Sequence, residues 1–260
     1  MSTDHAFLAI TIGNSRTRLA TFIGDEFQNQ ADFNTSDTTE IVELALKLWK
    51  NLEAESPQIV MAASDEIAGE AISAMLSDQT STQLWQIGKD IPVAIGQHLD
   101  PETITGTDRL LNAAAAWEMS KLATIVVDAG TCVTVDFIDG EGTFHGGAIA
   151  PGAQMQLTAM HTGTTALPEV DFDRPLKEAF GKNTAQAMLQ GVYQGIRGMV
   201  RQLSEQYASR YGAYPRVIAT GGNALMLFED EDLIEQIIPD LQFQGIAISV
   251  KHAMSVEEDA

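Results

Sequence analysis

The stretch Val127-Asp128-Ala129-Gly130-Thr131-Cys132-Val133-Thr134-Val135-Asp136 contains the pattern on which the fold assignment rests. Thr124 to Val127 predicts a buried strand, the residues from Asp128 to Thr131 predict a turn, and Cys132 to Ile138 predicts a second strand. Backbone N–H groups in such a turn can bind an anion, and the Thr131 hydroxyl can donate to a phosphate oxygen. Asp128 beside a phosphate can hold a cation. The alternative is an ordinary β-hairpin with a solvated aspartate.

The same pattern occurs near the N-terminus. Ala6 to Ile12 is apolar, the turn Gly13-Asn14-Ser15 follows, and Leu19 to Ile23 predicts a second strand. The repeat of strand, glycine turn and strand suggests two related halves. We therefore predict an α/β protein with two lobes, residues 1–118 and 119–260, whose two turns hold a polyphosphate from opposite sides of a cleft.

Helical and strand-like segments alternate along the rest of the chain. A capping pair, Asp37 with Glu40, precedes apolar residues at helical spacing. Further helices are expected over residues 66–76, 108–119, 183–211 and 224–229, and further strands over 58–63, 84–88 and 216–219.

Charge and composition exclude several classes of partner. The chain has 36 Asp and Glu against 15 Lys and Arg, a net charge of −21, which disfavours nucleic acid and anionic membranes as partners. The single cysteine, Cys132, excludes an internal disulfide and fits a reducing compartment. No secretory signal and no apolar stretch of about 20 residues is found, so we expect a cytoplasmic protein.

Gly106-Thr107-Asp108-Arg109 is a second candidate site, at the expected start of a helix. Asp108 can accept the proton of a substrate hydroxyl, and Arg109 can bind a carboxylate through two parallel hydrogen bonds. The alternative is a capped helix with a surface ion pair.

Two further stretches are rich in glycine. Gly146 to Gly152 indicates close approach of the backbone to a ligand or another strand, or a tight structural corner. Thr220-Gly221-Gly222-Asn223 lies between an expected strand and an expected helix, a position suited to a base or ribose passing over the backbone. The 5 histidines show no metal-ligand spacing.

Taken in order, these motifs resemble the type III pantothenate kinases of the acetate kinase/sugar kinase/Hsc70/actin superfamily. The resemblance covers about Leu8 to Ala224. Besides the motifs quoted above and Arg16, it includes Thr165-Ala166-Leu167-Pro168 and Asn183-Thr184.

The resemblance implies two ribonuclease H-like lobes, a homodimer, and transfer of the ATP γ-phosphate to the hydroxyl of pantothenate, the first step of coenzyme A biosynthesis. It implies Asp108 as the catalytic base and Asp128 as the ligand of a monovalent cation, potassium or ammonium, with Mg²⁺ accompanying ATP. The implied pantothenate site contains His98, Gly106, Thr107, Asp108, Arg109, Thr165 and Thr184. The implied nucleotide site contains Thr11, Gly13, Asn14, Ser15, Arg16, Gly130, Thr131, Gly221 and Gly222.

The sequence departs from the family pattern at two places. The family usually has an aspartate two residues before the first glycine, where this chain has Thr11. His98 replaces the aromatic residue that commonly precedes the Gly-x-Asp-Arg motif, and the stretch from Leu99 to Thr105 is one residue longer. The alternative function is a catalytically impaired homologue that serves as a nucleotide-binding sensor or binds a partner.

Overall fold

The chain forms two compact units in the computed structural model, which describes residues 5–24, 26–52, 54–80 and 82–258. Unit 1 comprises Met1–Ile95, Thr103–Ala115 and Leu241–Ala260. Unit 2 comprises Gly96–Glu102 and Ala116–Asp240. The chain therefore passes between the units more than once.

These bounds differ from the single boundary between residues 118 and 119 that the sequence predicts. The C-terminal helix α7 (Leu241–Glu258), which the sequence analysis did not predict, belongs to unit 1. Its Phe243 and Ile246 are buried in the same core cluster as Leu111. A Cβ atom at Gly245 would lie 2.2 Å from the Leu111 carbonyl oxygen, so the glycine lets α7 approach that backbone. Apolar burial, rather than position in the sequence, decides where this helix packs.

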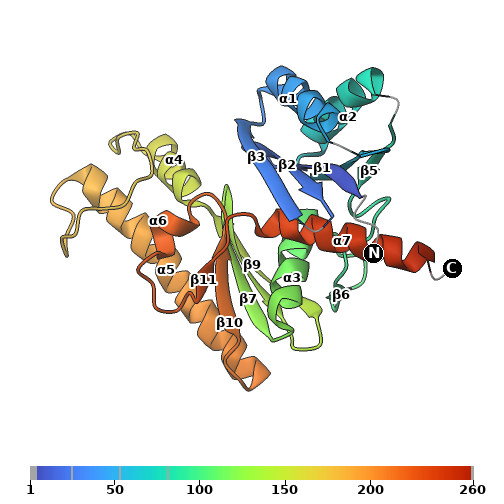
Figure 1. Cartoon of the computed structure of the whole chain (residues 1–260). Coiled ribbons are helices and arrows are strands. Elements are labelled where there is room, and N and C mark those ends of the chain that lie inside the picture. Colours follow the sequence, from blue (N-terminus) through green and yellow to red (C-terminus); the bar gives the residue numbers. More distant parts are fainter. Residues whose placement is uncertain (1–4, 25, 53, 81, 259–260) are drawn as a thin grey trace. The chain divides into compact units, whose positions relative to one another are not determined.

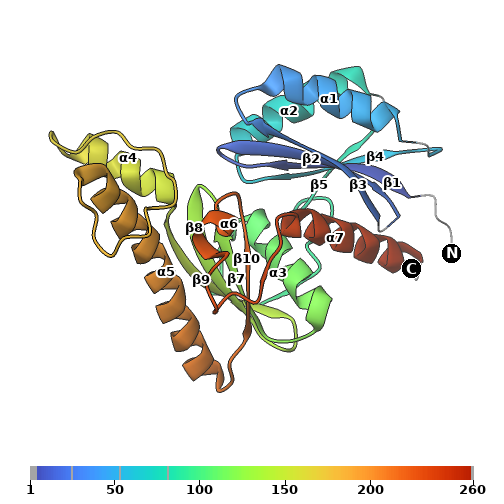
Figure 2. The same cartoon turned by 60° about the vertical axis from the view of Figure 1, so that its left-hand side comes forward.

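Unit 1 is a five-stranded sheet with helices on both faces (Figure 1). The strand order is β3-β2-β1-β4-β5. The strands are β1 Ala6–Ile12, β2 Arg16–Ile23, β3 Glu26–Asn34, β4 Gln58–Ala63 and β5 Leu84–Gln86. The helices are α1 Thr38–Lys50, α2 Glu66–Gln79 and the first part of α3 Thr107–Ser120, besides α7. Figure 2 shows α1 and α2 together on one face and α7 on the other.

Alternation along β1 assigns its side chains to the two faces. Leu8, Ile10 and Ile12 pack in the cluster that includes α1 and α2. Phe7 and Ala9 pack in the cluster that includes α7. Since side chains on a strand alternate, position 11 lies on the face of Phe7 and Ala9.

The sequence signals for helix caps and strands in unit 1 were only partly correct. Asp37 is the N-cap of α1, but its side chain makes no capping hydrogen bond, so the predicted capping pair is wrong. Asp65 caps α2 instead, accepting from the Ala68 N–H at 3.0 Å. Strand β3 was not predicted because most of its residues are polar and exposed; it is held by antiparallel pairing with β2.

Unit 2 is a six-stranded sheet of order β11-β10-β7-β8-β9-β6, with α4, α5 and α6 packed in one apolar cluster against it. The strands are β6 Gly96–Gln97, β7 Thr124–Ala129, β8 Cys132–Ile138, β9 Thr143–Pro151, β10 Arg216–Thr220 and β11 Gln236–Ile237. The helices are α4 Ala153–Gly163, α5 Thr184–Tyr211 and α6 Ala224–Phe228, besides the end of α3. In Figure 2, α4 lies beside the first part of the long α5.

The glycine-rich stretch from Gly146 to Gly152 forms the end of β9 and the start of α4. A Cβ atom at Gly147 would lie 2.0 Å from the Val135 carbonyl oxygen on β8. Close approach to another strand, one of the predicted readings, is therefore what this position requires.

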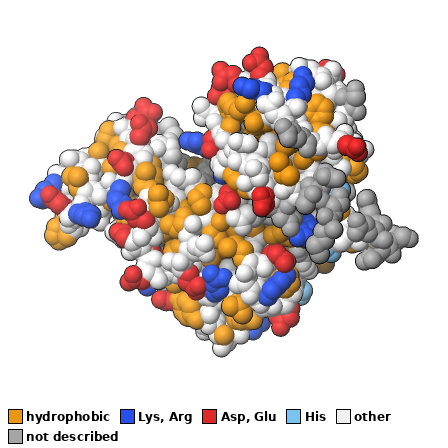
Figure 3. Space-filling view, viewed as in Figure 1, with side chains coloured by type: hydrophobic (Ala, Val, Ile, Leu, Met, Phe, Trp, Pro, Cys, Tyr) orange, Lys and Arg blue, Asp and Glu red, His pale blue; other side chains and the backbone are white. Residues whose placement is uncertain are grey.

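Acidic side chains are dispersed over the surface in Figure 3, on both units, and alternate there with basic and apolar groups. Within the part of the chain that the structure describes, no helix has the combined length and hydropathy needed to cross a bilayer.

Candidate active site

The first glycine turn, in unit 1, is held on two sides by hydrogen bonds. The Gly13 N–H donates to the Arg16 carbonyl at 2.9 Å. The Thr35 hydroxyl donates to the Gly13 carbonyl at 2.7 Å, and the Thr35 N–H donates to the Ser15 carbonyl at 3.2 Å. Asn14 and Ser15 at the tip are exposed. The turn is thus fixed before any ligand arrives, which suits a phosphate-binding loop.

Thr11 is buried, at 3% exposure, directly across the hairpin from Arg18. Opposite residues in an antiparallel pair share one face of the sheet. The Arg18 Nε donates to Asp32 Oδ1 at 2.9 Å, and its guanidinium carbon lies 5.0 Å from the centre of the Phe243 ring. At the position where the family pattern has an acid, this chain therefore has a neutral residue that pairs across the hairpin with an arginine.

Asp108 lies in the first turn of α3, in unit 1. Its Oδ1 accepts a hydrogen bond from the Arg109 N–H at 2.9 Å. A Cβ atom at Gly106 would lie 2.5 Å from the same oxygen, so this position needs glycine for the carboxylate to fold back over the helix start. Thr107 and Arg109 flank the carboxylate and are half-buried.

In unit 2, Asp128 stands at the end of β7 in a row of polar residues. It pairs with Thr220 on β10 and with Thr134 on β8, so the three side chains share one face of the sheet. Within the described residues, the buried Thr134 hydroxyl makes no hydrogen bond. The sequence analysis included Thr134 and Thr220 in two separate motifs but did not group them with Asp128, because only the pairing register shows that they share its face of the sheet.

Two predicted glycines approach the Asp128 carboxylate. A Cβ atom would lie 2.4 Å from Asp128 Oδ1 if placed at Gly221 and 3.4 Å if placed at Gly130. Gly221 also has a φ of +94°, in the region that favours glycine. Gly222, the next residue, is exposed. The structure thus brings Gly221, which the sequence analysis assigned to a separate motif, to the turn that contains Asp128 and Gly130.

Backbone hydrogen bonds connect the loops of this cluster. The Gly130 N–H donates to the Cys132 carbonyl at 2.9 Å and closes the turn. The Gly152 N–H donates to the Thr131 carbonyl at 3.0 Å, and the Asn223 N–H donates to the Ala129 carbonyl at 2.9 Å. Thr131 itself is exposed at the tip of the turn. We call the group formed by Asp128, Gly130, Thr131, Gly221 and Gly222 the glycine cluster.

Replacing Gly221 by alanine tests whether the glycine cluster binds nucleotide. Gly221→Ala is expected to weaken ADP binding at least about tenfold, because the methyl group must displace the Asp128 carboxylate and the Ala129 backbone, whose carbonyl carbon would lie 2.6 Å from it. The positive φ adds strain of about 1 kcal/mol. Isothermal titration calorimetry with ADP measures the effect. Gly212→Ala is the matched control: Gly212 has a φ of +87° but nothing within 4 Å, so only stability should fall. Equal ADP affinity in both variants would contradict the assignment.

His98 lies in unit 2, just after the short edge strand β6. The backbone N–H of His98 donates to the Phe144 carbonyl at 2.9 Å. The centre of the His98 ring lies 5.3 Å from that of the His145 ring. The His145 Nε2 is 2.6 Å from Asp139 Oδ2. Burial alone would raise the pKa of Asp139, but the hydrogen bond and charge of His145 outweigh it and the pKa lies below its ordinary value. The exposed His98 ring therefore lies against a histidine that is itself paired with Asp139.

The two remaining predicted residues lie outside the glycine cluster. Thr165 is exposed on the segment after α4. Thr184 is the exposed first residue of α5, after the N-cap Asn183, whose side chain accepts from the Gln186 N–H at 2.9 Å.

Comparisons with known proteins give the fold. The ethanolamine utilization protein EutJ of Carboxydothermus hydrogenoformans superposes with a TM-score of 0.56 at 15% identity, over 94% of this chain and 89% of its own. MreB 5 of Spiroplasma citri, solved with AMPPNP, superposes with a TM-score of 0.54 at 10% identity, over 98% of each chain. The predicted fold class, the two-lobed actin-like ATPase fold, is confirmed.

Sequence comparisons give the family. The sequence model described as type III pantothenate kinase matches residues 7–206. The type III pantothenate kinase of Rhodospirillum rubrum is 36% identical over 93% of this chain and 96% of its own. That of a Ruegeria species is 31% identical over 97% of this chain and 99% of its own. The family model matches most of the chain, and the relatives align with it over nearly their full lengths. This chain therefore belongs to the type III pantothenate kinase family.

Proposed function

We propose that this protein transfers the γ-phosphoryl group of ATP to the hydroxyl of pantothenate, giving 4′-phosphopantothenate and ADP. Membership of the type III pantothenate kinase family carries the proposal, and the matched range, residues 7–206, contains both Asp108 and Asp128. The reaction is the first step of coenzyme A biosynthesis.

The two glycine turns are the proposed phosphate-binding groups. In unit 1 the turn from Gly13 to Arg16 is fixed by its own hydrogen bonds, and in unit 2 Gly130 and Thr131 form a closed turn. Preorganised backbone N–H groups stabilise phosphate charge without rearranging during the reaction. Gly221 and Gly222 offer a flat backbone to the base or ribose. Magnesium bound with ATP would offset the charge of the transferring phosphoryl group.

Asp108 is the proposed catalytic base. Phosphoryl transfer forms a bond between the pantothenate hydroxyl oxygen and the γ-phosphorus, and breaks the bond from that phosphorus to the oxygen shared with the β-phosphate. The hydroxyl proton goes to the Asp108 carboxylate. Arg109 on the same helix is the proposed partner of the pantothenate carboxylate.

Asp128 is the proposed ligand of a monovalent cation, potassium or ammonium. Its carboxylate shares one face of the sheet with two hydroxyl groups, Thr134 and Thr220, and the Thr134 hydroxyl is buried with no hydrogen bond among the described residues. Oxygen ligands of this kind fit a hard cation. The cation would neutralise part of the phosphate charge, which the protein, with its net negative charge, cannot do by itself.

His98, Thr165 and Thr184 are the proposed acceptor-side residues, in addition to Gly106, Thr107 and Arg109. The family resemblance supports this set, and it also supports the homodimer and cytoplasmic location that we propose with it.

A direct assay tests the proposal. Purified protein with ATP, magnesium, potassium and pantothenate is expected to yield 4′-phosphopantothenate and ADP, detected by mass spectrometry and a coupled ADP assay. Omitting pantothenate should leave only background hydrolysis. ADP binding without pantothenate-dependent turnover would contradict the kinase assignment.

A further inference from the structure

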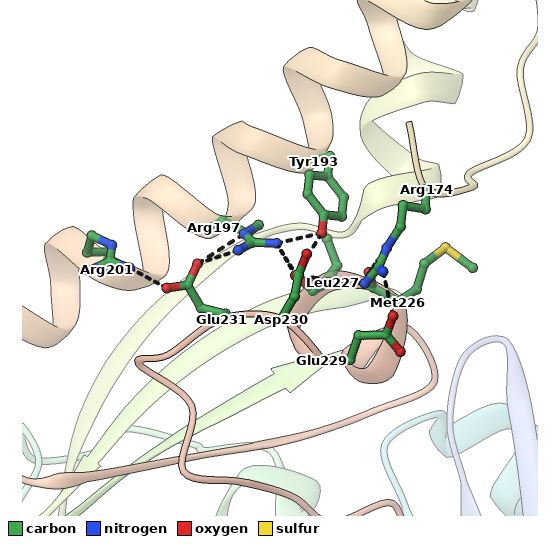
Figure 4. Close-up of polar contacts among 9 residues, drawn as sticks. All are labelled: Arg174, Tyr193, Arg197, Arg201, Met226, Leu227, Glu229, Asp230 and Glu231. Carbon is green, nitrogen blue, oxygen red and sulfur yellow. Dashed lines mark hydrogen bonds and ion pairs between the residues drawn. The ribbon is translucent and has the colours of Figure 1, made fainter. Parts of the chain in front are cut away.

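A group of arginines and carboxylates in unit 2 surrounds the C-terminal end of α6. Figure 4 shows Arg197 and Arg201 extending from α5, and Arg174 from the segment between α4 and α5, toward residues at the end of α6 and just after it. The group comprises Arg174, Tyr193, Arg197, Arg201, Glu229, Asp230 and Glu231. None of these residues has a role in the reaction proposed above.

Arg197 is the centre of the group. Its Nη1 lies 2.6 Å from Asp230 Oδ1 and 2.5 Å from the Tyr193 hydroxyl, and its Nη2 lies 2.8 Å from Glu231 Oε2. The Glu231 side chain is only 8% exposed and also pairs with Arg201. The hydrogen bond and charge of Arg197 hold the pKa of Asp230 below its ordinary value. These contacts fix the segment after α6 to α5.

Arg174 makes the contacts that reach α6 itself. Its Nε and Nη2 donate to the Met226 carbonyl at 3.3 and 3.0 Å, and its Nη1 donates to Glu229 Oε1 at 2.5 Å. Arg197 donates to the next carbonyl, that of Leu227, at 3.3 Å. The last carbonyls of a helix lack partners within the helix, and guanidinium groups satisfy them while opposing the negative end of its dipole.

The opposite end of α6 is joined to the glycine cluster. Gly221 and Gly222 come just before the helix, and the Asn223 N–H is bonded to the Ala129 carbonyl next to Asp128. The helix extends only from Ala224 to Phe228, so its own hydrogen bonds give it little stability. Its position therefore depends on the burial of Ala224, Leu227 and Phe228 in the apolar cluster and on the polar contacts at its two ends. Because Gly221 is already at close contact with Asp128, a small shift of α6 changes the cluster.

We propose that Arg174 is a positioning residue for nucleotide binding: by holding the C-terminal end of α6, it sets the place of the Gly221–Gly222 loop beside Asp128. It also connects that loop to the segment between Thr165 and Thr184, the proposed acceptor side. The proposal rests on the proposed function in one respect, namely that the glycine cluster binds the nucleotide.

Arg174→Ala is expected to weaken ADP binding about five- to thirtyfold and to raise the KM for ATP by a similar factor, because small displacements of binding groups have effects of this size or larger. The value of kcat should change less than twofold, since Arg174 contacts no proposed reacting group. Arg174→Lys should give an intermediate affinity. A lysine can still pair with Glu229, but it lacks the fork with which arginine reaches Met226 and Glu229 together.

Arg216→Ala is the matched control. Arg216 and Glu235 form an ion pair at 2.9 Å, in the same unit, with side chains 27% and 50% exposed, against 27% and 48% for Arg174 and Glu229. Its removal should leave ADP affinity unchanged. Calorimetry with ADP and steady-state kinetics with ATP are the measurements.

The outcomes separate this proposal from the kinase assignment. ADP affinity in Arg174→Ala equal to that of the wild type or of Arg216→Ala would overturn the positioning role, as would a fall in kcat with no change in the KM for ATP. If Arg174→Ala does not fold, wild-type affinity in a folded Arg174→Lys would overturn it too. Loss of ADP affinity in a protein that does not phosphorylate pantothenate would support the positioning role and refute only the proposed acceptor. A wild-type protein that does not bind ADP would refute both.

Discussion

Asp108→Asn is expected to lower kcat about 10²- to 10⁴-fold, the usual contribution of a general base. The amide oxygen of asparagine can still accept the hydrogen bond from the Arg109 N–H, so the helix start keeps its geometry. The amide cannot take the proton of the pantothenate hydroxyl. The KM for ATP should stay within about twofold, because Asp108 contacts neither glycine turn among the interactions described.

Steady-state kinetics with ATP and pantothenate, together with ADP calorimetry, make the measurement. Glu118→Gln is the control: Glu118 is an exposed acid on the same helix that pairs with Lys121 at 2.6 Å, so it removes one negative charge far along α3 from the proposed base. A wild-type kcat in Asp108→Asn would refute the base. An equal fall in kcat in Glu118→Gln would mean that the loss of any negative charge on α3, rather than the loss of the base, lowers the rate.

Thr11→Asp is expected to raise kcat by about tenfold or more, up to about a thousandfold. The residue lies on β1 where the family pattern has an aspartate, and a carboxylate there can help to organise magnesium on the transferring phosphoryl group. Burying a new charge usually destabilises a protein. Here Arg18 lies directly across the hairpin and can pair with the new carboxylate. We therefore expect the variant to fold.

Thr11→Asn is the matched control, since asparagine has the shape of aspartate without its charge. It should give no increase in kcat, and thermal unfolding of both variants checks that each is folded. A rate for Thr11→Asp at or below that of the wild type would mean that the site is built around threonine and Arg18, and that it does not use a carboxylate at this position.

Local sequence patterns were sufficient for the two glycine hairpins and for the helix start at Asp108. The strands on either side of Gly13 and Gly130 were recognisable from short apolar runs, and each turn from its own glycine. Both signals depend on residues that are neighbours in the chain, so reading along the sequence finds them. The fold class and the family followed from the order of these motifs.

Neither strand β3 nor helix α7 was predicted, but only β3 lacks a signal in the sequence. The residues of β3 are mostly polar and exposed, so its sequence carries no apolar alternation. In α7, Phe243, Ile246 and Val250 do follow a helical spacing. That spacing predicts a buried face, but it does not say which unit buries it.

Only the tertiary structure decided which side chains meet at the candidate site. Pairing register placed Thr134 and Thr220 beside Asp128, and folding brought Gly221 to the same carboxylate. Arg174 likewise reaches Met226 from a distant part of the chain. The physical reason is that hydrogen-bond register, close backbone contact and ion pairing join residues far apart in sequence, and no local pattern carries that information.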